Sequence, residues 1–174
     1  MSAPGLIGAI VTFGGVGHLR PAPGTWGSLA AVALAVLAYE LGWVLLVPLG
    51  AVLATILGFW AIPRAIAGSQ DQDPSEIVID EVAGQWLALC FTLLPLWWHG
   101  VEGLLFGAWP GWVMPFVLFR LFDIWKPWLV GRADRRGDAA GVMIDDLWAG
   151  LFAGIVSVIM AGLYHGVLQP WLQG

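Results

Sequence analysis

Long apolar runs alternate with short polar segments along the chain, and this alternation predicts helices that cross a membrane. A membrane-spanning helix needs about 20 mostly apolar residues. Five runs approach this length and predict an all-α, polytopic membrane helix bundle of about five spans, of which the first is short. These runs cover residues 28–39 (extendable to 43), 44–62, 80–98, 104–122 and 146–163. No soluble domain, linker or repeat separates them, so we interpret residues 1–174 as one membrane-embedded domain.

The N-terminal run differs from the others because residues 6–13 are apolar but too few to span a bilayer. We expect this segment to lie at the membrane interface or to cap the bundle. The N-terminus lacks a basic start and a cleavage pattern, which argues against a signal peptide.

The composition supports a membrane protein and excludes other classes. The hydrophobic fraction is 59%, whereas soluble proteins have roughly 45–50%. A soluble helical protein needs a polar face on each surface helix, and residues 28–62 offer almost none. The net charge of -5 argues against nucleic acid as a partner, because phosphate contacts need a basic surface. The single cysteine, Cys90, excludes an intramolecular disulfide.

The charges are distributed unequally between the two sides of the expected bundle. With five spans, successive loops lie on alternating sides, and one side holds every lysine and arginine: Arg20, Arg64, Arg120, Lys126, Arg132, Arg135 and Arg136. The opposite side holds Glu40, His99, Glu102 and His165. Basic residues are enriched in cytoplasmic loops. The sequence therefore predicts that the basic side faces the cytoplasm.

Carboxylates gather at about one predicted depth, at the basic ends of three helices. They are Asp80 and Glu81 at the start of the third span, Asp123 at the end of the fourth, and Asp145 and Asp146 at the start of the fifth. Carboxylate oxygens suit Mg²⁺ as ligands. Because so much negative charge near a bilayer needs a counter-ion, we predict that these residues bind one or two Mg²⁺ ions.

Helix capping is the alternative explanation for these acids. An acid at a helix N-terminus gains roughly 0.3–1 kcal/mol from the helix dipole, so capping is the simpler account of any single residue. It explains two adjacent pairs less well, and it does not explain Asp123 at a helix C-terminus. Small residues about one turn after each pair would let the helices approach closely around a shared site. These small residues are Gly84, Ala149 and Gly150.

Two cations stand beside the acids and are candidates for binding a phosphate. Arg120 and Lys126 flank Asp123, and Pro127 indicates that the helix ends by Lys126. Lys126 would then lie at the mouth of the site. Its alternative role is that of an interfacial anchor next to a tryptophan.

A second candidate for phosphate binding is the glycine-containing segment 22–28. Its hydroxyl groups, Thr25 and Ser28, and its backbone N–H groups would form a phosphate cradle at a helix N-terminus. A rigid turn with Ser28 as the helix cap explains the segment equally well. Other phosphate and hydrolase motifs are absent from the sequence: there is no G-x-x-x-x-G-K-[ST] and no G-x-S-x-G.

Four sequence blocks occur in an order and spacing that resemble a known family. They are PAPGTWGSL at 21–29, IVIDEVAG at 77–84, FRLFDIWKPW at 119–128 and GVMIDDLWAG at 141–150, together with Asp134. With these blocks the chain resembles phosphatidylglycerophosphatase A, a family of bacterial inner-membrane lipid phosphatases. The resemblance implies Mg²⁺-dependent hydrolysis of phosphatidylglycerophosphate to phosphatidylglycerol and phosphate, by a multi-pass protein whose active site faces the cytoplasm. It adds Asp134 to the substrate-binding residues, and Leu129 departs from a proline that is frequent in the family.

The residues and the resemblance together predict a metal-dependent phosphatase. Bound Mg²⁺ would polarise the phosphate and lower the pKa of an attacking water. The five carboxylates would act as ligands or base, and Arg120 and Lys126 would neutralise phosphate oxygens. The identity of the base, an aspartyl-phosphate intermediate and a homo-oligomer stay open. The rival hypothesis is a divalent-cation transporter or channel, which would place its acids near the bilayer midplane.

Overall fold

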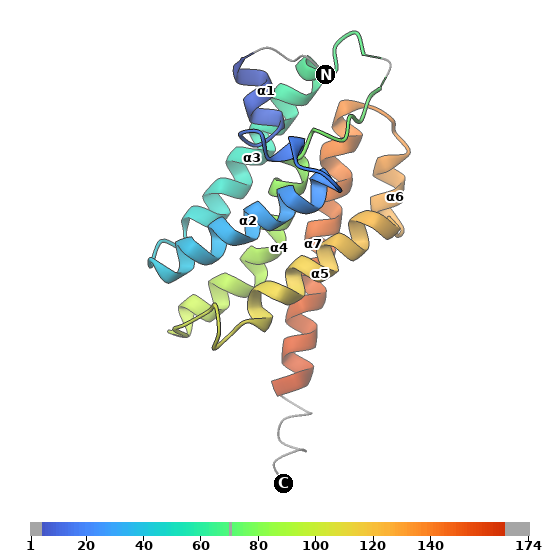
Figure 1. Ribbon diagram of the computed structural model, residues 1–174. Coiled ribbons are helices and arrows are strands. Elements are labelled where there is room, and N and C mark those ends of the chain that lie inside the picture. The colour runs from blue at the N-terminus through green and yellow to red at the C-terminus, as the bar shows by residue number, and fades with distance from the viewer. Residues whose placement is uncertain (1–4, 70, 166–174) are drawn as a thin grey trace.

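The computed structural model describes residues 5–69 and 71–165 of the chain. These residues form a bundle of helices, and no strand occurs among them (Figure 1). The elements are α1 (Leu6–Val11), η1 (Val16–His18), α2 (Pro23–Glu40), α3 (Leu46–Ala65), α4 (Ile79–Trp98), α5 (Pro110–Trp125), α6 (Leu129–Asp134) and α7 (Ala139–Leu163). The predicted all-α class is therefore confirmed.

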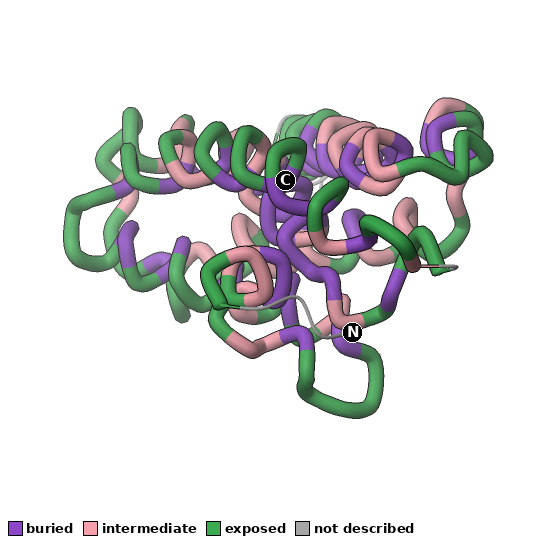
Figure 2. Tube along the Cα trace, turned by 90° about the horizontal axis from the view of Figure 1, so that it is seen from above, coloured by how far each residue is buried: buried purple, intermediate pink, exposed green. Residues whose placement is uncertain are grey.

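Helix α4 is the centre of the bundle and contacts α2, α3, α5 and α7. Small residues on different sides of α4, Ala83, Gly84 and Ala88, are fully or almost fully buried and let its neighbours approach closely. Seen from the end at which α4 begins, the buried positions lie between the helices and the exposed positions point outward (Figure 2). Polar residues near the start of α4 are consequently enclosed by other helices.

Three helices, α3, α4 and α7, are long and apolar enough to cross a membrane by length and composition. Helix α2 has 18 residues and begins with a polar turn, and α5 has only 16 residues. The prediction of about five spans is therefore not confirmed by this measure. The outer surface nevertheless suits lipid, because α3 exposes the apolar side chains Val52, Ile56 and Trp60 along one face.

The start of α7 differs from its predicted start at residue 146. Asp138 caps the helix by accepting a hydrogen bond from the backbone N–H of Gly141 at 2.7 Å, so α7 begins at Ala139. Asp145 and Asp146 consequently lie about two turns inside the helix. They are not N-terminal caps, and the capping alternative is wrong for this pair.

Other helix boundaries also differ from the predicted ones. Helix α5 begins at Pro110 and not at residue 104, since proline suits the first helical position and the glycine-containing residues before it form turns. The segment between the fourth and fifth predicted spans contains the short helix α6. Helix α3 continues past its predicted end at residue 62, through Pro63, to Ala65.

The N-terminal segment caps one end of the bundle, as one of the two sequence alternatives proposed. Helix α1 packs against α3, and η1 packs against α2. The backbone N–H of Val78 donates to the carbonyl of Val11 at 2.9 Å, and Gly17 lies so close to Glu76 that a Cβ would come within 2.0 Å of its carbonyl oxygen. These contacts fix the backbone directly before Asp80.

The two ends of the bundle differ in charge. The starts of α2, α4 and α7 and the ends of α3 and α5 gather at one end (Figure 1), where the lysine and the arginines lie. At the other end, Glu40 accepts a hydrogen bond from the backbone of Leu105 at 2.9 Å, and the Tyr39 hydroxyl donates to the Val101 carbonyl at 2.6 Å. The first end holds the predicted site residues.

Candidate active site

Helices α4 and α7 cross closely next to the predicted site, and glycine makes this crossing possible. A Cβ at Gly84 would lie 2.5 Å from the carbonyl oxygen of Asp146, and a Cβ at Gly150 would lie 2.2 Å from the carbonyl oxygen of Gly84. Only glycine allows backbones to approach this closely. The crossing brings the first turn of α4 next to Asp146, and it confirms the close approach that the small residues predicted.

Asp80, Glu81 and Asp146 form one group whose carboxylate oxygens lie within 4.8 Å of one another, among the residues that the structure describes. Asp80 is only 5% exposed and Asp146 only 3%. Two oxygens of the group, Oδ1 of Asp80 and Oε2 of Glu81, are buried without a hydrogen-bond partner. We call these three residues the carboxylate cluster.

The carboxylate cluster fits a divalent cation. Buried charges need a partner of opposite sign or a metal, because removal from water is costly. Three clustered carboxylates, two of them with an unpartnered oxygen, offer an oxygen-only donor set of the kind that hard cations such as Mg²⁺ prefer.

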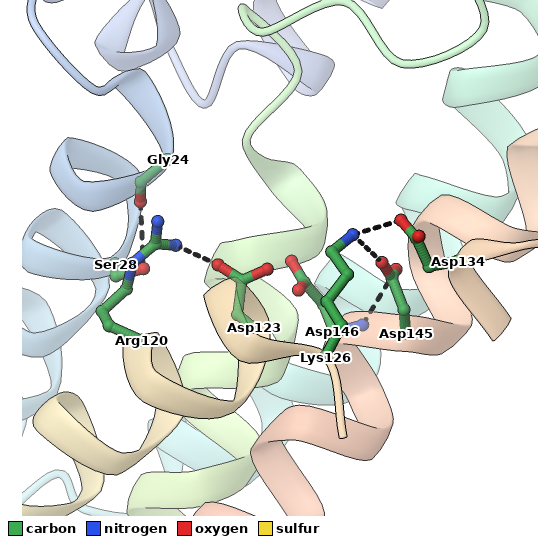
Figure 3. Close-up of polar contacts among 8 residues, drawn as sticks. All are labelled: Gly24, Ser28, Arg120, Asp123, Lys126, Asp134, Asp145 and Asp146. Atoms are coloured by element: carbon green, nitrogen blue, oxygen red, sulfur yellow. Dashed lines mark hydrogen bonds and ion pairs between the residues drawn. The ribbon is translucent and has the colours of Figure 1, made fainter. Parts of the chain in front are cut away.

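Asp123 lies beside the carboxylate cluster rather than within it. Its carboxylate forms an ion pair with Arg120, with Nη1 and Oδ2 2.6 Å apart, one turn along α5 (Figure 3). Asp146 interacts electrostatically with Asp123 as well as with Asp80 and Glu81. Of the five predicted carboxylates, Asp123 is thus a neighbour of the carboxylate cluster, and the third oxygen of the cluster comes from Glu81.

Asp145 points away from the carboxylate cluster and toward Lys126. Neighbouring residues of a helix face directions about 100° apart, so two adjacent acids serve two places. The Lys126 ammonium contacts carboxylate oxygens of both Asp134 and Asp145, the latter at 2.8 Å (Figure 3). We call Lys126, Asp134 and Asp145 the lysine network.

Lys126 stays charged within this network. Partial burial favours the neutral amine, but the hydrogen bonds and charges of Asp134 and Asp145 outweigh it and raise the pKa of Lys126. The residue ends α5 with a left-handed backbone conformation, at φ 50°, as the following proline indicated. Its side chain ties the end of α5 to α6 and α7.

Segment 22–28 is helical and is not a loop before a helix. Helix α2 starts at Pro23, so Ser28 is not its cap, and that alternative is wrong. The Ser28 hydroxyl is fully buried and donates to the carbonyl of Gly24 at 3.0 Å, whereas Thr25 is half-buried one turn earlier. The segment approaches the site through Gly24, where a Cβ would lie 2.0 Å from Oε1 of Glu81 and 3.4 Å from Nη1 of Arg120.

Two polar residues near the site were missed by the sequence reasoning. Asp73, in the loop before α4, interacts electrostatically with Lys126, Asp134 and Asp123. Its pKa is raised, first by desolvation and then by neighbouring carboxylates, against the lowering effect of Lys126. Gln85 is fully buried one turn after Glu81. A signal was available for Gln85, because it is a polar residue in an otherwise apolar helix, but not for Asp73, which is one of several polar residues in its loop.

A helical bundle with apolar outer faces and a carboxylate cluster at one end defines a helical membrane protein whose polar site lies at the bundle end, not at mid-depth. Sequence comparison gives the family. The chain belongs to the phosphatidylglycerophosphatase A family, whose model matches residues 9–161. This range contains every site residue named above.

Individual relatives agree with this assignment. A phosphatidylglycerophosphatase A from Haemophilus influenzae is 34% identical over 82% of this chain and 80% of its own. One from Escherichia coli is 32% identical over 87% of this chain and 77% of its own. A Bacteroides thetaiotaomicron protein with the provisional name phosphatidylinositol-3-phosphatase is 30% identical over 91% of this chain and 96% of its own. No solved structure matches the chain. The predicted family and the prediction of an enzyme are confirmed.

Proposed function

We propose that this protein is a Mg²⁺-dependent phosphatase that hydrolyses phosphatidylglycerophosphate to phosphatidylglycerol and phosphate. The observation that carries the proposal is the carboxylate cluster, with oxygens within 4.8 Å of one another, beside Arg120, in a family whose relatives from two bacteria are named for this activity. The substrate is a phosphate monoester on a lipid, which needs a polar site reachable from a bilayer.

Each group of residues has a role in this proposal. Asp80, Glu81 and Asp146 would hold the metal, which would act as a Lewis acid on the phosphate and lower the pKa of a water when bound. Arg120, fixed by Asp123 at 2.6 Å, binds phosphate oxygens beside the cluster. Thr25 lines the approach along α2. A carboxylate of the site accepts the proton of the attacking water.

The lysine network forms the second half of the proposed site. Lys126 binds a phosphate oxygen of the substrate, and its present partners Asp134 and Asp145 hold the ammonium in place and charged. An ammonium group that already donates to two carboxylates can donate to a third oxygen, because it has three N–H donors. Lys126 would thus act on the substrate without leaving the network.

We further propose that α2 and α5 also cross the membrane, with the basic end in the cytoplasm and the protein in the bacterial inner membrane. Exposed tryptophans mark both ends of the bundle, with Trp125 and Trp128 at the basic end and Trp43, Trp98 and Trp109 at the other. Tryptophan concentrates at membrane interfaces. Helix α5 runs from one set to the other, which supports a fifth span despite its length of 16 residues.

The transporter hypothesis is disfavoured by the position of the acids. In α4 the carboxylates occupy the first turn, and no charged residue follows in residues 82–98. An ion pathway needs polar groups further along the membrane. The bundle therefore suits chemistry at one face.

Phosphate release from purified full-length protein in detergent tests the proposal. We expect release from phosphatidylglycerophosphate that EDTA abolishes and added Mg²⁺ restores. Phosphatidylinositol 3-phosphate is assayed in parallel, because one relative is named for that lipid. Release that survives EDTA would remove the metal from the proposal, and release from the inositol lipid alone would replace the substrate.

A further inference from the structure

Gln85 has an unusual environment for a polar side chain. It is 0% exposed, and neither its amide nitrogen Nε2 nor its amide oxygen Oε1 has a hydrogen-bond partner. Buried amide groups are nearly always hydrogen-bonded, because an unmade bond is costly away from water. We therefore expect hydrogen-bond partners for the Gln85 amide among the polar groups near it.

The position of Gln85 on α4 directs its amide toward Glu81. The two residues are four apart, so they lie on the same face of the helix one turn from each other. Helical side chains lean toward the N-terminus, over the preceding turn. Glu81 lies in that preceding turn, and its Oε2 is itself buried without a hydrogen-bond partner.

Arg120, on α5, has an unpartnered donor of the complementary kind. Its Nε is buried and unpartnered, and its Nη1 and Oε1 of Glu81 both lie within 4 Å of the point where a Cβ of Gly24 would stand. Arg120 and Glu81 are thus neighbours. Counting donors and acceptors, the amide nitrogen of Gln85 matches the acceptor Oε2 of Glu81, and its amide oxygen matches the donor Nε of Arg120.

We propose that Gln85 is a positioning residue whose amide bridges Glu81 and Arg120. Its Nε2 donates to Oε2 of Glu81 and its Oε1 accepts from Nε of Arg120, after small rotations of the three side chains. One buried amide then sets the metal-binding carboxylate and the phosphate-binding guanidinium at a fixed separation. This inference rests on the proposed function of the carboxylate cluster, and it adds a residue from inside the bundle to the site.

The test is Gln85→Met, which keeps the length of the side chain and removes the amide. Mn²⁺ binding to the full-length protein in detergent, followed by electron paramagnetic resonance, measures the cluster directly. We expect about tenfold weaker Mn²⁺ binding, the scale at which outer-shell partners act on a metal, together with a raised KM for the lipid. Leu89→Met is the control, because Leu89 is fully buried one turn further along the same helix and has no polar group.

A double-mutant cycle separates positioning from packing. If Gln85 acts through Glu81, Gln85→Met should have little further effect on Mn²⁺ affinity in a Glu81→Gln background, whereas an independent packing effect would add. Should Gln85→Met fail to fold, Gln85→Asn, whose amide is too short to reach both partners, is measured with the same expectation.

The outcomes distinguish the two proposals. Wild-type Mn²⁺ affinity and KM in a folded Gln85→Met protein would overturn the bridge and leave the proposed function intact. Losses that add fully in the double mutant would also overturn it. A wild-type protein that neither binds Mn²⁺ nor releases phosphate would overturn the proposed function, and the bridge with it.

Discussion

Asp145 and Asp146 are neighbours in sequence, but the helix directs them to different partners. Asp146 belongs to the carboxylate cluster with Asp80 and Glu81. Asp145 contacts Lys126 at 2.8 Å. The sequence showed the pair as one acidic motif, because adjacent residues separate only when the start and the phase of the helix are known.

This division gives a prediction for the two single variants. Asp146→Asn should lower kcat/KM by roughly 100-fold or more, since even outer-shell partners of a metal contribute 10–100-fold, and raised Mg²⁺ should partly restore it. Asp145→Asn keeps the cluster and should lose much less, without Mg²⁺ rescue. Mg²⁺ titrations of activity measure both. Asp138→Asn, on the same helix but outside the site, is the control, because asparagine caps as well as aspartate. Equal losses at Asp145 and Asp146 would contradict the division.

The lysine network gives a second prediction. Lys126→Met should raise KM about tenfold, which corresponds to about 1.4 kcal/mol of lost binding, and should leave the protein folded. Arg132→Met removes a basic charge from nearby α6 and should change KM little. An unchanged KM in Lys126→Met would restrict Lys126 to a structural role.

The effect of Lys126 on KM should not depend on pH between about pH 7.5 and pH 9. The folded-state pKa of Lys126 is raised, so its ion pairs contribute fully below the unfolded value of about 10.4. Their contribution is lost only when pH rises through the higher folded value. KM ratios of Lys126→Met to wild type at pH 7.5 and pH 9 test this.

At the scale of elements, the crossing of α4 and α7 decides the geometry of the site. Both glycines of the crossing face a backbone, and backbone atoms cannot rotate aside as a side chain does. The two helices can therefore separate only as whole elements, which would widen the distance between Asp146 and the first turn of α4.

A methyl group at the crossing should show this effect. Gly150→Ala would place a Cβ 2.2 Å from the carbonyl oxygen of Gly84, and overpacking of this kind costs about 1–3 kcal/mol. We expect a lower melting temperature and weaker Mg²⁺ activation. Gly162→Ala, on the same helix with nothing within 4 Å of the added Cβ, should be neutral or stabilising. A neutral Gly150→Ala would contradict the tight crossing.

The helices were largely predictable from the apolar runs, and parts of the site were not. The runs gave α2, α3, α4 and the body of α7, because hydrophobic length alone defines a helix in lipid. The start of α7 was misplaced because the charged pair Asp145 and Asp146 interrupts the apolar sequence and was taken as the start of the span, whereas the helix begins after its cap at Asp138. The burial of Gln85 could not be predicted, because it depends on which face of α4 meets α2 and α5.

At the scale of the whole molecule, the orientation of the bundle decides whether the basic end, which holds the site, faces the cytoplasm. Gly131, in the short helix α6, is buried, and a side chain there would meet the carbonyl oxygen of Lys126 at 2.4 Å, so it is a poor labelling position. Labelling therefore needs exposed positions, and Arg135 at the basic end and Glu102 at the opposite end are both exposed.

Cysteine labelling in intact cells tests the orientation. In a Cys90→Ala background, Arg135→Cys should resist a membrane-impermeant maleimide and Glu102→Cys should react, because the positive-inside rule places the basic end in the cytoplasm. Labelling after lysis is the control for accessibility of both positions. The reverse pattern would invert the topology.

The central place of α4 also constrains the order in which the protein can be assembled. Ribosomes deliver α4 before α5 and α7, yet the acidic first turn of α4 lies beside Asp146 of α7 and Arg120 of α5. Before α5 and α7 are inserted, the acidic first turn of α4 stays in the insertion machinery or faces lipid. The last long helix to be synthesised thus completes both the cover and the metal-binding set, so a chain cut short before residue 139 would lack Asp146 and leave α4 as a target for membrane quality control.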